Sequence, residues 1–212
     1  MRFSMTPPPR DEAGFRRWTE DTIRRLAALA LDNQPRTDDL RFPATAINPT
    51  GAASDPDRDN DTGCWLFDGA TTTEQLLFIC QIPHSVALRF PLVPHVHWHK
   101  TSTASGNVRW IFNYKWWPLG AVLDTNWTTL TSSTPVAGTP DNNLVKEHLL
   151  TSFGNLDASS KEISDVLLIR LDRNPTHTDD TYGADAGLIE LDIHAKFDAL
   201  GSELEYEREG DY

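Results

Sequence analysis

The sequence predicts a mainly β protein: an antiparallel, jelly-roll-like β-sandwich preceded by an N-terminal α-helix and a linker. Three observations lead to this fold class. Helical periodicity is confined to the first 36 residues, short β-favouring segments follow one another from residue 64 onward, and two of those segments alternate apolar and polar side chains. A chain of 212 residues is about one domain with an appendage, and it buries a core without needing disulfides or metal.

Residues 1–36 are predicted to form a proline-containing arm followed by an amphipathic helix. Asp11 is a suitable cap for a helix that runs to about Asp32, and Pro35 ends it. The helix has an apolar stripe, which consists of Phe15, Trp18, Ile23, Leu26 and Leu29. Seven arginines and five acids give this segment a net charge of +2, whereas the remaining 176 residues, with 12 basic and 26 acidic side chains, carry −14.

This helix either packs on its own domain or docks onto a partner or onto copies of itself. Its position ahead of a linker rich in Pro, Asp and Gly favours the second arrangement, which makes residues 1–36 an anchor or oligomerisation element. Arginines at that interface would meet acidic surface. The side chains expected there are Phe15, Arg16, Arg17, Trp18, Arg24, Arg25 and Leu26.

Residues 37–63 are predicted to be a linker that contains an acidic loop. Residues 40–47 are broken by Pro43 and form an edge strand at best. Asp57, Asp59 and Asp61 fall at positions one, three and five of a calcium-loop pattern, with Asp68 at position twelve, but the sixth position is not glycine and no helices flank the loop. The loop is therefore either an irregular calcium site or a solvated turn.

Residues 64–201 are predicted to form the sandwich body, and residues 202–212 a loose acidic tail. In the segment 108–117 we expect Val108, Trp110, Phe112, Tyr114 and Trp116 to face the core. In the last strand we expect Ile189, Leu191, Ile193, Ala195 and Phe197 to face inward, and Glu190, Asp192, His194 and Lys196 outward. The expected strands are residues 64–67, 75–82, 86–92, 95–101, 108–117, 122–130, 163–173 and 188–197.

Three histidines alternate along one of these strands. Period two places His95, His97 and His99 on one face and turns Val96 and Trp98 to the core. His-x-His on a jelly-roll strand is a metal-ligand spacing used by cupins, although the glutamate of the cupin pattern is missing here. His95 and His97 are thus the candidate ligands, in a cupin-like metalloenzyme or on a three-fold axis between chains. In the alternative, the histidines make only polar hydrogen bonds.

A hairpin is the simplest pairing for the histidine strand. Residues 92–101 and 108–117 would turn about Ala104, which sets His99 opposite Arg109 and Trp98 opposite Trp110. An arginine opposite the histidine row disfavours a cation at that position.

Composition excludes several classes of function. A net charge of −12 argues against nucleic-acid binding, and no apolar run is long enough to span a membrane. No G-x-S-x-G motif or Gly-rich phosphate loop is present, and Cys64 and Cys80 are expected to be buried thiols rather than a bridge. The N-terminus lacks the apolar stretch of a secretory signal. Trp117 and Trp127 are the tryptophans expected to be exposed, as in a glycan-binding surface.

Four stretches carry a resemblance to a known group of proteins. These are LRFPATAINP with the following GAASDPD, then LVPHVHWHKT, then LLTSFGNLDASSKEISDVLLIRLDRN, and finally DDTYGADAGLIELDIHAKFDALGSE. Over about residues 38–203 the chain resembles a family of largely uncharacterised proteins of tailed bacteriophages. The resemblance implies a structural component of the virion, made in the host cytoplasm, without a cofactor and without catalytic residues to carry over.

Together these features lead us to expect a non-enzymatic, homotrimeric short tail fibre whose N-terminal segment attaches a jelly-roll body to the particle. The expected partners are copies of the chain itself, the tail adaptor or portal region, or the major capsid protein, and in addition a host surface glycan. A capsid decoration protein of the same architecture is the first alternative. A cupin-like metalloenzyme and a host-glycan-binding module are alternatives of another class.

Overall fold

The computed structural model describes residues 11–32, 35–49, 51, 54–130, 136–137, 144–198 and 201, without the side chains of residues 27–32 and 136–137. The proline arm, the acidic tail and the side chain of Leu29 lie outside the described residues. The chain divides into two compact units, residues 1–36 and 37–212. No described helix is long and apolar enough to cross a membrane.

The first unit contains helix α1, Glu12–Asp32, which agrees with the predicted helix. Its start is determined locally, because Oδ1 of Asp11 accepts a hydrogen bond from the backbone N–H of Gly14 at 2.8 Å. Thr19 and Thr22 donate their hydroxyls to the carbonyl oxygens four residues earlier, which keeps these polar groups satisfied within the helix.

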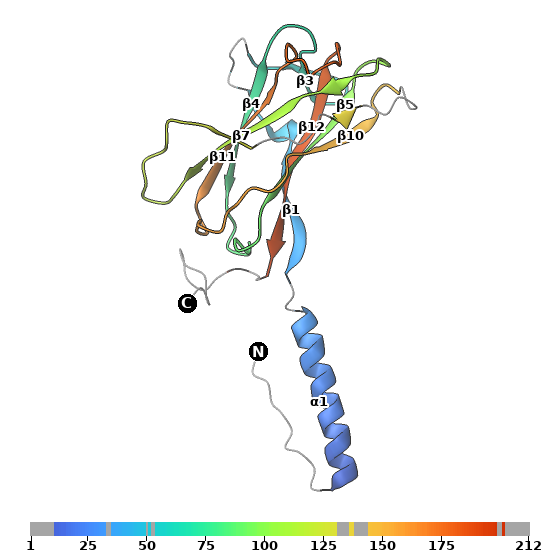
Figure 1. The fold of residues 1–212 in the computed structure, drawn as a ribbon, viewed down its shortest axis with the longest axis vertical. Coiled ribbons are helices and arrows are strands. Elements are labelled where there is room, and N and C mark those ends of the chain that lie inside the picture. The colour runs from blue at the N-terminus through green and yellow to red at the C-terminus, as the bar shows by residue number, and fades with distance from the viewer. Residues whose placement is uncertain are drawn as a thin grey trace. The chain divides into compact units, whose positions relative to one another are not determined.

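The second unit is a sandwich of antiparallel sheets, so the mainly β prediction is confirmed (Figure 1). One sheet has six strands in the order β10-β5-β12-β3-β2, with β1 also paired to β12; the other has four, β4-β11-β7-β8; β6 and β9 form a pair. The strands are β1 Arg36–Pro43, β2 Asp57–Arg58, β3 Trp65–Phe67, β4 Glu74–Gln81, β5 Val93–Lys100, β6 Asn107–Val108, β7 Trp110–Trp117, β8 Thr128–Leu130, β9 Val136–Ala137, β10 His148–Ser152, β11 Val166–Arg173 and β12 Ala186–Phe197.

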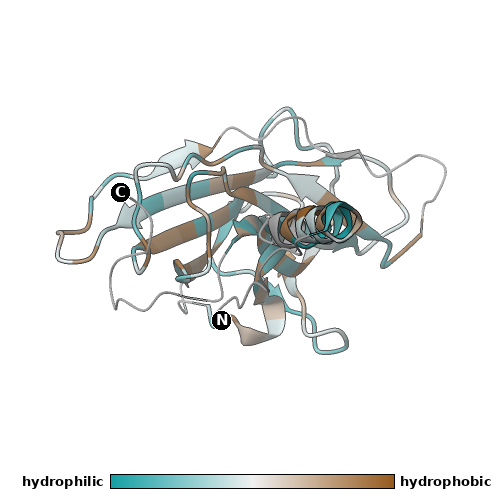
Figure 2. Ribbon diagram, turned by 90° about the horizontal axis from the view of Figure 1, so that it is seen from below, coloured by the Kyte–Doolittle hydropathy of each residue, from teal (hydrophilic) through white to brown (hydrophobic). Residues whose placement is uncertain are grey.

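Aromatic side chains from both sheets meet in the core. The ring centroids of Trp98 and Trp110 are 6.2 Å apart, and those of Phe67 and Trp110 are 4.9 Å apart, both in edge-to-face geometry. Hydrophobic and hydrophilic residues both occur along the strands of the sandwich (Figure 2), and residues 190–197 of β12 alternate polar and apolar side chains, as period two requires. The inward orientation predicted for Val96, Trp98 and Trp110 is confirmed, since each is almost fully buried.

The predicted hairpin between residues 92–101 and 108–117 is wrong. β5 pairs with β10 and β12, whereas β7 pairs with β8 and β11 in the opposite sheet. His99 therefore lies opposite His148 and Gly187 rather than Arg109. Trp98 and Trp110 do meet, but across the core, because alternation tells which face of a strand is buried and not which strand lies beside it.

A β-bulge overturns the predicted inward position of Ile189. The register of β12 against β5 shifts between Leu188 and Glu190, so Leu188 enters the core and Ile189 is only half-buried. Beyond the bulge the predicted phase holds, and Leu191 and Ile193 are fully buried.

Several other segment predictions need correction. Part of the predicted linker is strand β1, and β10 was not predicted at all. Residues 86–92 make only isolated bridges, from Val86 to Phe197 and from Leu92 to Leu156. Of residues 122–130, only Thr128–Leu130 form a strand.

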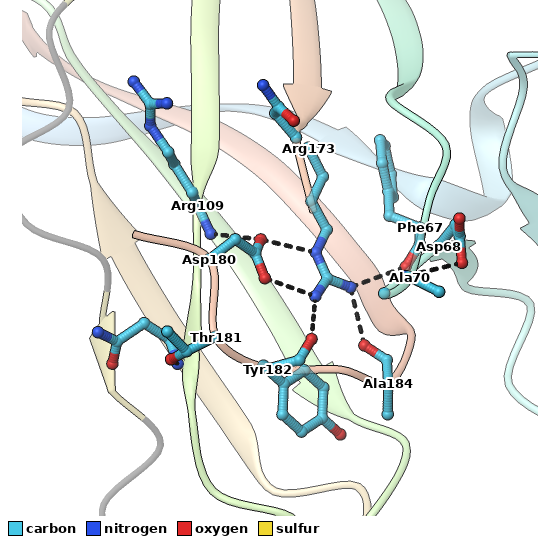
Figure 3. Close-up of polar contacts among 12 residues, drawn as sticks. Phe67, Asp68, Ala70, Arg109, Arg173, Asp180, Thr181, Tyr182 and Ala184 are labelled. Carbon is cyan, nitrogen blue, oxygen red and sulfur yellow. Dashed lines mark hydrogen bonds and ion pairs between the residues drawn. The ribbon is translucent and has the colours of Figure 1, made fainter. Parts of the chain in front are cut away.

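A buried guanidinium ties the two sheets together at the end of β11. Arg173 has no exposed surface, and it donates two hydrogen bonds of 3.0 Å to the carboxylate of Asp180. Its other donors reach the carbonyl oxygens of Phe67, Tyr182 and Ala184 (Figure 3). Since Phe67 belongs to β3 in the other sheet, Arg173 fastens both sheets and the segment before β12 at one point.

Candidate functional site

The first candidate surface is the apolar stripe of α1, of which the side chains of Phe15, Trp18, Ile23 and Leu26 are described. At about 100° per residue Phe15, Trp18 and Leu26 fall within an arc of about 80° on one side of the helix, and Ile23, which is 60% exposed, lies about 60° beyond Leu26. Phe15 is 49% exposed and Leu26 51%, and the rings of Phe15 and Trp18 stack with centroids 6.1 Å apart. The stripe thus presents large apolar side chains to its surroundings.

The arginines predicted at the helix interface are all exposed. Nη2 of Arg16 lies 3.0 Å from Oε1 of Glu12, and Nε of Arg17 donates to the carbonyl of Ala13 at 3.4 Å. Arg24 and Arg25 lie two positions and one position before Leu26, and both are exposed. A pair as exposed as Arg16 and Glu12 contributes little to stability, so these charges are available to a partner.

The second candidate site is a histidine cluster on the outer face of the six-stranded sheet. Register places side chains of neighbouring strands on this face: His148 from β10, the row His95, His97 and His99 from β5, and Asp192 and His194 from β12. Five of the chain's seven histidines thus share one face of one sheet. His95 and His99 are buried there by their neighbours, although the face points away from the core.

Asp192 is at the centre of this cluster. Its Oδ1 lies 3.8 Å from Nδ1 of His95, and its Oδ2 lies 3.3 Å from Nε2 of His97 and 4.0 Å from Nε2 of His194. Nε2 of His194 is also 3.2 Å from Oδ1 of Asp39 on β1. One carboxylate therefore faces three imidazoles. Sequence alone predicted His95 and His97; Asp192 and His194 had no local signal, because β12 is almost 100 residues away.

His97 connects the cluster to β10. Its Nδ1 is 2.8 Å from Nε2 of His148, while its Nε2 faces Asp192. A neutral His97 that donates from Nε2 to Asp192 and accepts at Nδ1 satisfies both contacts. Among the described residues, one group of three potential metal ligands has its ligand atoms within 4.8 Å of one another: His95, Asp192 and His194. His97 is outside this group, and its contact with Asp192 can orient that carboxylate.

Burial shapes the protonation of the cluster. The pKa of His95 is lowered, chiefly because burial disfavours its charged form and in addition because His194 lies close by, with ring centroids 4.1 Å apart. A neutral imidazole keeps a free nitrogen lone pair, which is the form that binds a metal ion.

The aspartates of the acidic loop, and Asp68 after it, form hydrogen bonds and an ion pair within the protein. Asp59 accepts hydrogen bonds from the N–H of Asp61 and the hydroxyl of Thr62, which lowers the pKa of its carboxyl group. Asp61 pairs with Lys146, and Asp68 accepts from three successive backbone N–H groups of its own turn. Asp57 lies in β2. Asp59 and Asp68 thus stabilise their own turns, and Asp61 pairs with a distant lysine.

A cysteine–histidine contact was not predicted from the sequence. Both cysteines are free and buried, as expected. Burial raises the pKa of Cys80 to about 11. Burial also opposes ionisation of Cys64, but the nearby His99 and Thr62 outweigh it and lower its pKa, while Cys64 in turn raises the pKa of His99.

The two tryptophans expected at the surface differ. Trp117 is 42% exposed, as predicted, with its indole N–H donated to the carbonyl of Ala121. Trp127 was also predicted to be exposed but is half-buried, because Lys115 and Arg170 lie over its ring at 4.6 and 5.1 Å from the centroid.

Comparison with known proteins identifies no family. No family model and no curated protein matches the chain. Among solved structures there is a similarity to the crystal structure of dimeric latent PorU from Porphyromonas gingivalis, with 13% identity and a TM-score of 0.34. It covers 84% of this chain and 14% of that chain, so this chain spans about one seventh of that protein's length. A similarity of this strength carries neither a fold assignment nor a function.

Proposed function

We propose that the chain is a non-enzymatic structural protein of a bacteriophage virion, a homotrimeric short tail fibre in which α1 associates with α1 of two other copies and residues 1–36 attach the sandwich to the particle. The observation that carries the proposal is the exposed apolar stripe on a capped helix. Phe15 and Leu26 are each about half exposed on α1, and most of the stability of helices in proteins comes from packing of such an apolar face against other elements.

Charges beside the stripe favour copies of the chain as the occupant. Glu12 and Arg16 flank it on one side, and Asp21 and Arg25 on the other, both pairs spaced i,i+4 with the acid first. Each flank therefore carries one charge of each sign. A surface of this kind is complementary to itself, as in helical bundles whose apolar seam is bordered by charged positions.

The sandwich supplies the outward body of the fibre. Residues 37–212 carry the −14 charge of the chain, which keeps such a body soluble and separate from its neighbours. The same architecture serves a capsid decoration protein, which is the alternative setting. Attachment to tail or capsid distinguishes the two.

Oligomeric state tests the role of α1. We expect the full chain to be trimeric at micromolar concentration in light scattering coupled to gel filtration, and Phe15→Glu to shift it toward monomer. The matched control is Ala13→Glu, which adds the same charge on the opposite side of the same helix and leaves the trimer intact. A wild-type chain that stays monomeric at 100-fold higher concentration contradicts the proposal.

Particle location tests the setting. Mass spectrometry of purified phage particles should detect the wild-type chain, and Phe15→Glu should reduce its amount relative to Ala13→Glu. A reconstruction of the intact particle then assigns the chain to tail or capsid. Particles that lack the wild-type chain contradict a virion role, even if the chain is trimeric.

A further inference from the structure

We propose that His95, Asp192 and His194 form a binding site for one Zn²⁺ ion within each chain, on the outer face of the six-stranded sheet. The site is independent of the helix-mediated assembly proposed above. No sequence motif predicts this site, because its ligands come from two strands that are distant in the chain and adjacent in the sheet.

The ligand atoms are spaced close to what the ion requires. Zinc bonds of 2.0–2.1 Å in tetrahedral geometry separate two ligand atoms by about 3.3 Å. Nδ1 of His95 is 3.8 Å from Oδ1 of Asp192, and Nε2 of His194 is 4.0 Å from Oδ2 of Asp192. Each pair is too far apart for a good hydrogen bond, and the two pairs would contract by about 0.5 and about 0.7 Å to hold the ion. One ligand atom from each of the three residues lies within 4.8 Å of the other two.

Two buried polar atoms point to a missing partner. Nδ1 of His95 and Oδ1 of Asp192 are both buried without a hydrogen-bond partner, and their side chains are only 9% and 6% exposed. Leaving two such groups unsatisfied costs free energy. A cation between them satisfies both atoms at once.

The sheet holds the ligands in place. His95 lies directly opposite Asp192 in the β5–β12 register, and His194 is two residues further along β12, on the same face. His97 contacts Oδ2 of Asp192, which is the kind of outer contact that orients a metal ligand. Asp39 lies 3.2 Å from Nε2 of His194, the nitrogen that would bind the ion, and therefore lies beside the site. Ligands on rigid strands lose little freedom when the ion binds.

The donor set selects the kind of ion. Two imidazole nitrogens and one carboxylate oxygen suit zinc and similar transition metals, whereas calcium and magnesium prefer oxygen ligands alone. His194, whose side chain is 41% exposed, lies on the open side, which leaves the fourth position to water or to Asp39. The ion is therefore reachable from solvent.

Titration of the untagged full chain with ZnCl₂ in isothermal calorimetry tests the site. We expect one ion per chain, and at least a tenfold loss of affinity in both Asp192→Asn and His95→Ala. The matched control is His177→Ala: Nδ1 of His177 lies 3.5 Å from Oδ2 of Asp179, an exposed His–Asp pair, and its removal should leave binding unchanged. Near-ultraviolet circular dichroism checks that each variant is folded.

Each outcome decides the proposal. Substitution by Co²⁺ should give the visible absorption of a tetrahedral site in the wild type and lose it in Asp192→Asn. Absence of stoichiometric binding by the wild type overturns the proposal. So does one ion per three chains, which places the site on a three-fold axis, or equal affinity of wild type and Asp192→Asn. Binding by the monomeric Phe15→Glu chain would support the site even if the trimer is disproved.

Discussion

Replacement of Arg173 by leucine should destabilise the sandwich more than the replacement of any exposed arginine. The substitution removes all five hydrogen bonds of the guanidinium and leaves the carboxylate of Asp180 buried, at 1% side-chain exposure, without its counter-ion. Three carbonyl oxygens lose their donor at the same time. Breaking a buried ion pair by removal of one partner costs about 3–5 kcal/mol.

We therefore expect the free energy of unfolding to fall by about 4 kcal/mol, a large part of the 5–15 kcal/mol typical of a domain. Urea unfolding followed by tryptophan fluorescence measures it on the full chain. The control is Arg89→Leu, because Arg89 is 58% exposed and makes an ion pair with Asp198, whose side chain is 11% exposed. Water can reach that carboxylate once Arg89 is removed, so the change should cost less, about 1–2 kcal/mol.

A double variant separates the buried charge from the lost carbonyl contacts. Asp180 also accepts a hydrogen bond from the backbone N–H of Arg109 at 2.9 Å, so Arg173→Leu with Asp180→Asn removes the unpaired charge but keeps an acceptor for that N–H. We expect the double variant to recover about 1–2 kcal/mol relative to Arg173→Leu. If Arg173→Leu costs no more than Arg89→Leu, the interpretation of Arg173 as the fastening point of the two sheets is wrong.

Three further changes test the electrostatics and packing of the sandwich. Burial raises the pKa of Glu74 from 4.5 to about 7, so between these pH values the folded state holds a proton that the unfolded state has released. The stability that this proton contributes is fully present below pH 4.5 and is lost as the pH rises through about 7. Relative to Glu74→Gln, the wild type should lose up to about 3 kcal/mol between pH 4.5 and 8 in urea unfolding, and parallel pH profiles would contradict this. Iodoacetamide at pH 7.5 should alkylate Cys64 faster than Cys80, which is also buried, and His99→Ala should reduce the difference, as followed by peptide mass spectrometry. Gly187→Ala should destabilise the sandwich by about 1–3 kcal/mol, because a Cβ there would lie 2.1 Å from Nε2 of His99; an unchanged melting temperature would show that the ring moves freely.

Local chemistry explains which parts of the fold could be predicted. The start of α1 depends on Asp11 and Gly14, three residues apart, and the buried face of β5 follows from alternation within eight residues. The bulge at Ile189 could not be predicted, since it is defined by a register against β5 and not by the residues of β12 themselves. β10 was missed for a related reason: it is a strand because it pairs with β5, and its own residues, of which only Thr151 is buried, show no apolar alternation.

The sequence by itself determined the fold class, the N-terminal helix with its apolar stripe, and the presence of three histidines on one strand face, because helix caps and two- or 3.6-residue periods are local properties of the chain. Only the tertiary structure decided which strands are neighbours. Pairing of β5 with β12 brought Asp192 and His194 to His95, and pairing with β10 brought His148 to His97. Contacts between residues so far apart depend on the packing of the whole sandwich, and no local pattern carries that information.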